Sequence, residues 1–329
     1  MTFHPDELGD LSDRVYVVTG ATGGIGYYTA ARLAKHQAHV YLCARTKELG
    51  DVTRLRMQST YHNARLSILV MDHTRLSTVV TAAKEFCSSE TRLDGLVNNA
   101  GIMATPFALT NDGYEEQWQT NYLAHWVLTW HLLPVMLQTS LRTDLAPGRV
   151  RIVNLSSSGH YRAPKDGINF TDIALQASSG MARYGQSKLA NILHSGILHR
   201  LFGPGSPSSV ANRGELWVSA VHPGLVKSGL GAKAQLPIVI RALIAPYRWV
   251  GGEIDADKGS WTTLFCVAGA AMKRDDCGKY WQRMTDPNGW QSATSKDSGL
   301  AERLEEWTAK EMSEGGWIQM AVTSTYQQV

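Results

Sequence analysis

Tyr184 and Lys188 lie four positions apart and are the pair of side chains in this sequence that suits proton transfer. They stand at the start of a helix-compatible stretch, and four residues make about one helical turn, so the phenol and the ammonium project from one face. A free tyrosine has a pKa of about 10, and a nearby cation favours its phenolate form. The pair predicts a tyrosine acid/base supported by a lysine.

Three serines follow the apolar run 151–155 and provide candidate hydroxyls for the same chemistry. A hydroxyl at the carboxyl end of a buried parallel strand points into the ligand crevice, where it can hydrogen-bond a carbonyl oxygen. We expect one of Ser156, Ser157 and Ser158 to have this role and the other two to cap the turn.

A glycine-rich turn lies between the apolar run 15–19 and the helix-patterned stretch 25–35. Such a turn lets the backbone approach a pyrophosphate, and the helix that follows presents free N–H groups and a partial positive charge to it. The sequence therefore predicts a dinucleotide site. Its binding residues are expected to include Gly20, Thr22, Gly24 and Gly26.

Arg45 follows the second apolar run, 39–44, at the position where an NAD enzyme usually has an acidic residue. A carboxylate there would repel a 2′-phosphate, whereas a guanidinium can form a charge-assisted pair with one. The sequence therefore predicts NADP(H) as the cofactor.

Apolar runs recur along the chain at 66–70, 95–98, 150–155 and 216–221, with helix-length segments between them. This alternation predicts an α/β fold with a Rossmann-type, doubly wound parallel sheet. No linker divides the chain, so we expect a single dinucleotide-binding and catalytic domain over 1–329, with a candidate substrate lid at 229–257.

Composition and charge exclude several other classes of protein. The net charge of +3 is small and the basic residues are scattered, which gives nucleic-acid binding no electrostatic support. The apolar stretch 236–245 is shorter than the roughly 20 residues of a spanning helix. The four cysteines have no ligand spacing, and His160 and His222 suit packing or polar lining better than metal binding. We expect a cytoplasmic protein with no metal and no transmembrane segment.

The ordered set of motifs resembles the short-chain dehydrogenase/reductase family, in its single-domain branch and near the retinol-dehydrogenase-like members. The matching positions include the glycine turn, Asp72, the run 98–101, Asn121, the Tyr-Lys pair and Pro223-Gly224. The resemblance implies a catalytic set of Asn121, Ser157, Tyr184 and Lys188, in which Asn121 positions a water and Lys188 also holds the nicotinamide ribose. It further implies that Ile25 lies at the pyrophosphate and that Asp72 and Asn98 contact or support the adenosine side of the cofactor. Ala100, Pro223, Gly224, Val226 and Ser228 are the other cofactor residues that it implies, and it allows a homo-oligomer.

Two departures from the family pattern affect these assignments. Ser228 stands where a threonine is more usual, although the hydroxyl is retained. Ser157 and Tyr184 are separated by 27 positions, about twice the separation in the shortest members, so Ser156 and Ser158 remain alternatives to Ser157.

The apolar and aromatic composition of 230–250 favours a lipophilic carbonyl or alcohol substrate of terpenoid, polyketide, steroid or retinoid-like type, such as biosynthetic pathways use. Two other functions are open: a non-catalytic NADP(H)-binding regulatory protein, and an NAD-dependent epimerase or dehydratase. The intact catalytic set disfavours the first, and Arg45 with the run 98–101 disfavours the second.

Overall fold

Seven parallel strands form one sheet in the computed structural model, which describes residues 3–142, 144, 146, 148–227, 230, 253–282, 286–287 and 289–319. The strands are β1 (Val15–Val18), β2 (His39–Ala44), β3 (Arg65–Val70), β4 (Gly95–Asn98), β5 (Arg151–Leu155), β6 (Trp217–His222) and β7 (Tyr280–Gln282). They pair in the order β3-β2-β1-β4-β5-β6-β7. The predicted Rossmann-type parallel sheet is therefore confirmed.

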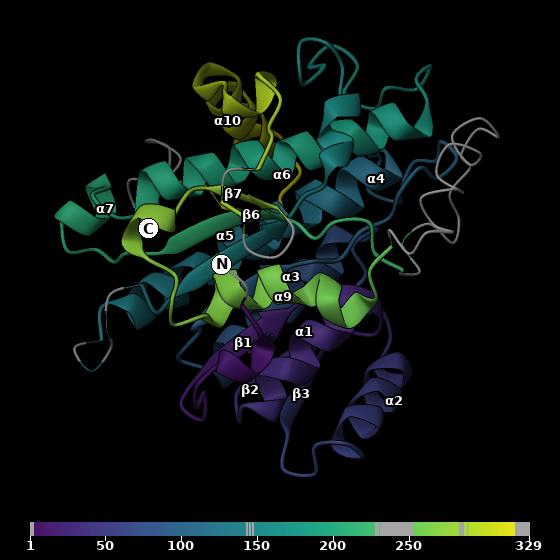
Figure 1. Cartoon of the computed structure of the whole chain (residues 1–329). Helices are drawn as coiled ribbons and strands as arrows, with labels where there is room; N and C mark the ends of the chain where they lie inside the picture. The colour runs from purple at the N-terminus through teal and green to yellow at the C-terminus, as the bar shows by residue number, and fades with distance from the viewer. Residues whose placement is uncertain are drawn as a thin grey trace.

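Helices connect the strands and cover the sheet (Figure 1). The α-helices are α1 (Gly24–Lys35), α2 (Lys47–Gln58), α3 (Leu76–Ser89), α4 (Glu116–Trp118), α5 (Ala124–Ser140), α6 (Gly180–Phe202), α7 (Pro207–Val210), α9 (Ala256–Ala268) and α10 (Ser298–Glu314). Shorter helical turns are η1 (Pro5–Glu7), η3 (Ser158–Arg162), η5 (Arg274–Asp276), η6 (Thr294–Lys296) and the π-helical turn η2 (Gln119–Leu123). Among the described residues, no helix is long and apolar enough to cross a membrane.

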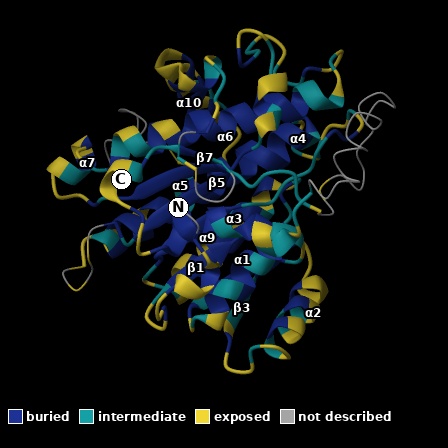
Figure 2. Cartoon of the chain, in the orientation of Figure 1, coloured by how far each residue is buried: buried dark blue, intermediate teal, exposed yellow. Residues whose placement is uncertain are grey.

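The strands are apolar at consecutive positions because both faces of the sheet are covered. Val15 and Val17 of β1 pack in a core with α3, α5 and α6, whereas Tyr16 and Val18 pack in a second core with α1 and α9. Successive side chains of a strand point to opposite faces, so each core takes every second residue. Figure 2 shows the central strands buried and the outer faces of α2, α7 and α10 exposed.

The strand order reverses between β1 and β4, and this reversal places the loops that matter for function. The chain runs outward from β1 to β3 and then returns to pair β4 with the other edge of β1. In open parallel sheets, ligands bind at the carboxyl ends of the strands beside such a switch point. The loops after β1, β4, β5 and β6 all lie at this end of the sheet.

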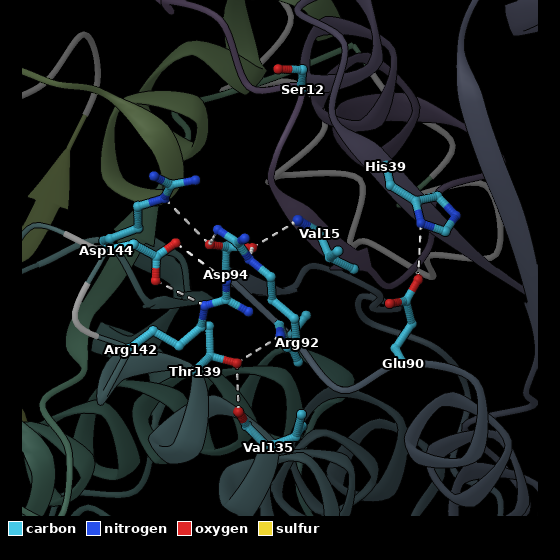
Figure 3. A network of polar contacts seen from close by, with 12 residues as sticks. Ser12, Val15, His39, Glu90, Arg92, Asp94, Val135, Thr139, Arg142 and Asp144 are labelled. Carbon is cyan, nitrogen blue, oxygen red and sulfur yellow. Dashed lines mark hydrogen bonds and ion pairs between the residues drawn. The ribbon is translucent and has the colours of Figure 1, made fainter.

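A buried carboxylate, Asp94, ties together the opposite ends of three strands (Figure 3). It accepts hydrogen bonds from the Val15 amide at 2.9 Å and from the Arg92 guanidinium at 2.8 and 2.9 Å. The Arg149 Nε lies 3.4 Å from the same carboxylate, and the Asp94 carbonyl accepts from the Arg151 amide at 2.9 Å. Asp94 thus links the amino ends of β1, β4 and β5.

Replacing Asp94 with Ala should lower the free energy of unfolding by about 3–5 kcal/mol, because the buried Val15 amide and the partly buried Arg92 guanidinium lose their acceptor. Urea unfolding of the full chain measures this change. Asp144→Ala is the matched control, since Asp144 pairs with Arg142 at the surface, where an ion pair adds little. Equal losses in the two variants would contradict the role given to Asp94.

Candidate active site

Tyr184 and Lys188 lie on one face of α6, as their spacing predicts. Ser179 caps this helix by accepting a hydrogen bond from the Ala182 amide, so Tyr184 stands in the second turn. Both side chains are buried, and the Lys188 Nζ lies 5.9 Å from the centre of the tyrosine ring. The amine donates to the Leu155 carbonyl at 2.9 Å, so α6 is fastened to the carboxyl end of β5 at this point.

Burial shifts the pKa values of both Tyr184 and Lys188 when no cofactor is bound. It raises the pKa of Tyr184 to about 12, while a hydrogen bond from the Ser157 hydroxyl lowers it in part. It also lowers the pKa of Lys188 to about 7. Tyr184 is therefore a neutral phenol that can donate a proton near neutral pH. That Lys188 lowers the pKa of Tyr184 stays a prediction, and it applies to the protein with the cofactor bound.

The three serines after β5 have different surroundings. The Ser156 hydroxyl is buried and donates to the Lys188 carbonyl at 2.7 Å, and Ser158 is exposed. The Ser157 hydroxyl accepts from the Gly159 amide at 3.0 Å and contacts the Tyr184 phenol. A hydroxyl that accepts one hydrogen bond still has its proton to donate. Among the three, Ser157 has the geometry expected of a catalytic hydroxyl.

Asn121 lies in the π-helical turn η2 and hydrogen-bonds both to the loop after β4 and to α6. Its Oδ1 accepts from the Ile102 amide at 2.8 Å, and its Nδ2 donates to the Ile102 carbonyl at 3.0 Å and to the Ser187 Oγ at 2.9 Å. A Cβ added at Gly101 would lie 3.0 Å from Asn121 Oδ1 and 3.5 Å from Lys188 Nζ. Asn121 thus lies close to the Tyr-Lys pair, with its side chain committed to the protein.

The glycine-rich turn after β1 fits a dinucleotide phosphate. Gly20 has φ +63°, and a Cβ at Gly26 would lie 2.3 Å from the Gly20 carbonyl oxygen, so the turn is closed tightly on itself. Gly23 is exposed, and an added Cβ there would meet no atom within 4 Å. It precedes α1 without a side-chain cap, which leaves the first N–H groups of that helix for an anion.

Comparison with known proteins agrees with this geometry. A family model described as short chain dehydrogenase matches residues 14–167. Short-chain dehydrogenase/reductase drtF of Aspergillus calidoustus is 44% identical over 311 residues, which cover 94% of this chain and 96% of that protein. The chain belongs to the short-chain dehydrogenase/reductase family. The family resemblance inferred from the sequence is confirmed.

Two further matches extend over most of this short-chain dehydrogenase/reductase. Retinol dehydrogenase 12 of Mus musculus is 32% identical over 299 residues, covering 89% of this chain and 84% of that protein. The crystal structure of an uncharacterized protein from Mycobacterium paratuberculosis is 28% identical with a TM-score of 0.71, covering 95% of this chain and 98% of that one. The likeness therefore spans the fold as well as the motifs.

The residues that were predicted for the adenosine side of the cofactor differ in how accessible their side chains are. Arg45 is exposed at the end of β2 and forms no ion pair within the described ranges, whereas Lys47 pairs with Asp51 at 2.6 Å. The Asp72 carboxylate accepts from the amide and the hydroxyl of Thr74 at 3.0 and 2.9 Å. Arg45 is thus more accessible to a ligand than Asp72, whose carboxylate accepts two hydrogen bonds from Thr74.

The side chain of Asn98 is turned into the core. Its Nδ2 donates to Asn154 Oδ1 at 2.8 Å and to Thr129 Oγ1 at 3.0 Å, which joins β4 to β5 and α5. Of the two roles that the resemblance allows it, support of the strand end fits this geometry and direct contact by the side chain does not.

The segment after β6 brings two predicted cofactor residues together. Gly224, after Pro223, has φ +94°, and Val226 forms an isolated parallel bridge with Ile254. A Cβ added at Gly259 would lie 2.8 Å from Val226 Cγ2 and 3.3 Å from Ile25 Cγ1, so Val226 and Ile25 meet at the start of α9. Ser228 lies outside the described residues, as does the candidate lid 229–257 except for 230 and 253–257.

Thr19, Asn99 and Ala100 lie in motifs that were identified from the sequence, but their contacts with one another and with His125 were not predicted. The Thr19 hydroxyl accepts from the amides of Asn99 and Ala100 at 2.8 and 2.9 Å, and the Asn99 Nδ2 donates to the Thr19 carbonyl at 2.7 Å. The His125 Nε2 lies 2.8 Å from the Thr19 hydroxyl, and its Nδ1 lies 3.0 Å from the Asn121 carbonyl. The four-residue spacing from Asn121 to His125 was a signal available in the sequence.

A buried ion pair beside Tyr184 was also missed. The Arg183 Nε lies 3.1 Å from the Glu115 carboxylate, and the guanidinium donates to the Thr105 carbonyl at 3.0 Å. Burial raises the pKa of Glu115. This pair closes the loop that follows β4 onto the first turns of α6, immediately before the tyrosine.

Proposed function

We propose that this oxidoreductase is an NADPH-dependent carbonyl reductase or alcohol dehydrogenase that acts on a lipophilic ketone or aldehyde of terpenoid, polyketide, steroid or retinoid-like type. The observation that carries the proposal is a buried phenol, Tyr184, with the Ser157 hydroxyl beside it and Lys188 one turn further along α6. We also propose that residues 1–329 make one domain, because the described ranges contribute to a single sheet.

The chain's residues divide the reaction between them. When bound, the nicotinamide supplies or accepts the hydride. The phenol of Tyr184 donates a proton to the carbonyl oxygen during reduction, and its phenolate removes one from the alcohol during oxidation. The Ser157 hydroxyl donates a hydrogen bond to the same oxygen and so stabilises the negative charge that develops there.

Lys188 and the glycine turn hold the cofactor in this proposal. The Lys188 amine uses one hydrogen on the Leu155 carbonyl and keeps the others for the nicotinamide ribose. The N-terminal amides of α1, following the turn from Gly20 to Gly26, take the pyrophosphate. Asn121 holds the loop after β4 through Ile102 and α6 through Ser187. Its Oδ1 can accept a second hydrogen bond, with which it positions a water for proton relay.

Arg45 supports the preference for NADPH over NADH. It is exposed at the end of β2, where the ribose of the adenosine lies in this fold, and it forms no ion pair in the described part of the chain. A guanidinium can form two parallel hydrogen bonds with a phosphate.

The lipophilic substrate is supported by the composition of 230–250 and by the similarity to retinol dehydrogenase 12, which is named for a lipophilic alcohol. An apolar and aromatic wall buries a polycyclic or terpenoid carbonyl compound better than a sugar or an oxo acid.

A panel of carbonyl compounds tests the proposal. The purified protein is mixed with NADPH and with steroid, terpenoid, polyketide-like, retinoid, sugar or oxo-acid carbonyls, and the loss of reduced nicotinamide is followed by absorbance. We expect turnover with lipophilic carbonyls and faster turnover with NADPH than with NADH. Turnover of hydrophilic carbonyls alone would overturn the substrate class, and binding of NADPH with no turnover of any carbonyl would favour a regulatory protein.

Single alanine replacements of the three serines should give different results. Ser157→Ala should lower kcat by about a hundredfold with little change in NADPH affinity, because one hydrogen bond to the developing oxyanion is lost. Ser158→Ala should leave kcat within about twofold of the natural enzyme, since surface substitutions away from special features change little. A large loss in Ser158→Ala with an active Ser157→Ala would show that the serine is wrongly assigned.

A further inference from the structure

His160, three residues after Ser157, is buried and bridges two distant segments of the chain. Its Nδ1 lies 2.7 Å from the Ser157 carbonyl oxygen, and its Nε2 lies 3.2 Å from the amide nitrogen of Ser292. Its ring also packs edge-on against Tyr280 of β7, with centroids 5.4 Å apart. The turn that carries Ser157 is therefore fastened to the segment that precedes α10.

The two partners of the imidazole define its proton positions. A backbone amide can only donate, so Nε2 must accept from Ser292 and carry no proton. The single proton is then on Nδ1, which donates to the Ser157 carbonyl. Burial lowers the pKa of His160, in agreement with a neutral ring. Both ring nitrogens of His160 thus form hydrogen bonds to backbone groups.

The turn that His160 holds packs directly on Tyr184. A Cβ added at Gly159 would lie 2.6 Å from the Tyr184 ring and 3.3 Å from the Ser157 Oγ. A Cβ added at Gly185 would lie 2.5 Å from the Ala163 amide nitrogen. The backbone of η3 is therefore closely packed against the first turns of α6. A shift of η3 would move Ser157 relative to Tyr184.

We propose that His160 is a positioning residue for Ser157. Its neutral imidazole fixes the Ser157 peptide, and the Gly159 amide then orients the Ser157 hydroxyl so that its proton points toward Tyr184 and the substrate oxygen. Ser292 holds the far side of the ring, so the placement of a reactive hydroxyl depends on a segment more than a hundred residues away. This inference rests on the proposed function of Ser157 and Tyr184.

Three substitutions separate the two hydrogen bonds of the imidazole. His160→Asn keeps a donor at the position of Nδ1, His160→Gln keeps an acceptor near the position of Nε2, and His160→Phe keeps neither. We expect kcat to fall about 10- to 50-fold in His160→Phe and His160→Gln, with NADPH affinity unchanged, and to return to within about threefold in His160→Asn. An Asn variant as impaired as the Phe variant would overturn the proposal.

A double-mutant cycle shows whether His160 acts through Ser157. In a Ser157→Ala background, His160→Phe should lower kcat by no more than about twofold, because the group that it positions is already gone. Losses that add in full would contradict this, since a purely structural defect would also impair the alanine variant. Thermal unfolding of each variant checks that it is folded. If His160→Phe does not fold, the test rests on the comparison of His160→Asn with His160→Gln.

Hydrogen exchange followed by mass spectrometry tests the positioning without any substrate. Amide hydrogens in the peptides 157–163 and 289–297 should exchange about tenfold faster in His160→Phe than in the natural enzyme. In His160→Asn, only the peptide 157–163 should return to the natural exchange rate. Unchanged exchange would overturn the proposal even in an active enzyme. An inactive natural enzyme with the expected exchange pattern would instead refute the proposed function and leave the placement of Ser157 by His160 intact.

Discussion

Replacing Tyr184 with Phe should lower kcat by about three orders of magnitude, because the proton donor is removed while the ring that packs under η3 is kept. NADPH affinity should change little, since the phenol contributes to the chemical step more than to binding. Steady-state kinetics with the best lipophilic carbonyl of the panel, together with a fluorescence titration of NADPH, measures both quantities.

Tyr161→Phe is the matched control for this prediction. Tyr161 lies on η3, in the same region, but its side chain is 50% exposed. The loss of its hydroxyl should therefore leave kcat within about twofold of the natural value. Retention of turnover in Tyr184→Phe would remove the phenol from the reaction and would leave Ser157 and Lys188 without their proposed partner.

Converting Arg45 to Asp should change the ratio of kcat/KM for NADPH to that for NADH by about a thousandfold in favour of NADH. The substitution removes a charge-assisted pair with the 2′-phosphate and places a carboxylate where it repels that phosphate and can accept from a ribose hydroxyl. The two effects act in the same direction on the ratio. The measurement is the initial rate at limiting concentrations of each cofactor.

Arg54→Asp controls for the change in net charge. Arg54 is on α2, the helix that follows Arg45, and it pairs with Asp51, so its replacement alters the local charge by the same amount without changing the strand end. We expect the cofactor ratio of this variant to stay within about threefold of the natural value. An equal change in both variants would assign the preference to the general field of α2 and remove Arg45 from the role.

The fold was predictable because its signal is local. The six predicted strands are short and carry apolar runs, as β1 does from Val15 to Val18, and the segments between them have helical length. The seventh strand, β7, was not predicted because it has only three residues. The Tyr184-Lys188 pair was predictable for the same reason, since helix geometry alone places residues four apart on one face. The glycine turn was identified from its position between a strand and a helix.

Contacts between distant residues could not be predicted in this way. The sequence left Ser156, Ser157 and Ser158 open, and their surroundings on α6 and η3 distinguish them. The inward orientation of Asn98 depends on Asn154, 56 residues away. His160 was expected to be a packing or polar-lining group, and its partner Ser292 lies 132 residues away, at a separation where local spacing carries no information.

A crystal structure of the enzyme with NADP⁺ and an unreactive lipophilic alcohol or ketone tests the central claim most directly. The account predicts that the Tyr184 and Ser157 hydroxyls both hydrogen-bond the ligand oxygen, with the reacting carbon about 3–3.5 Å from the nicotinamide ring. A nicotinamide bound away from α6, or a Tyr184 hydroxyl that does not reach the ligand, would contradict it.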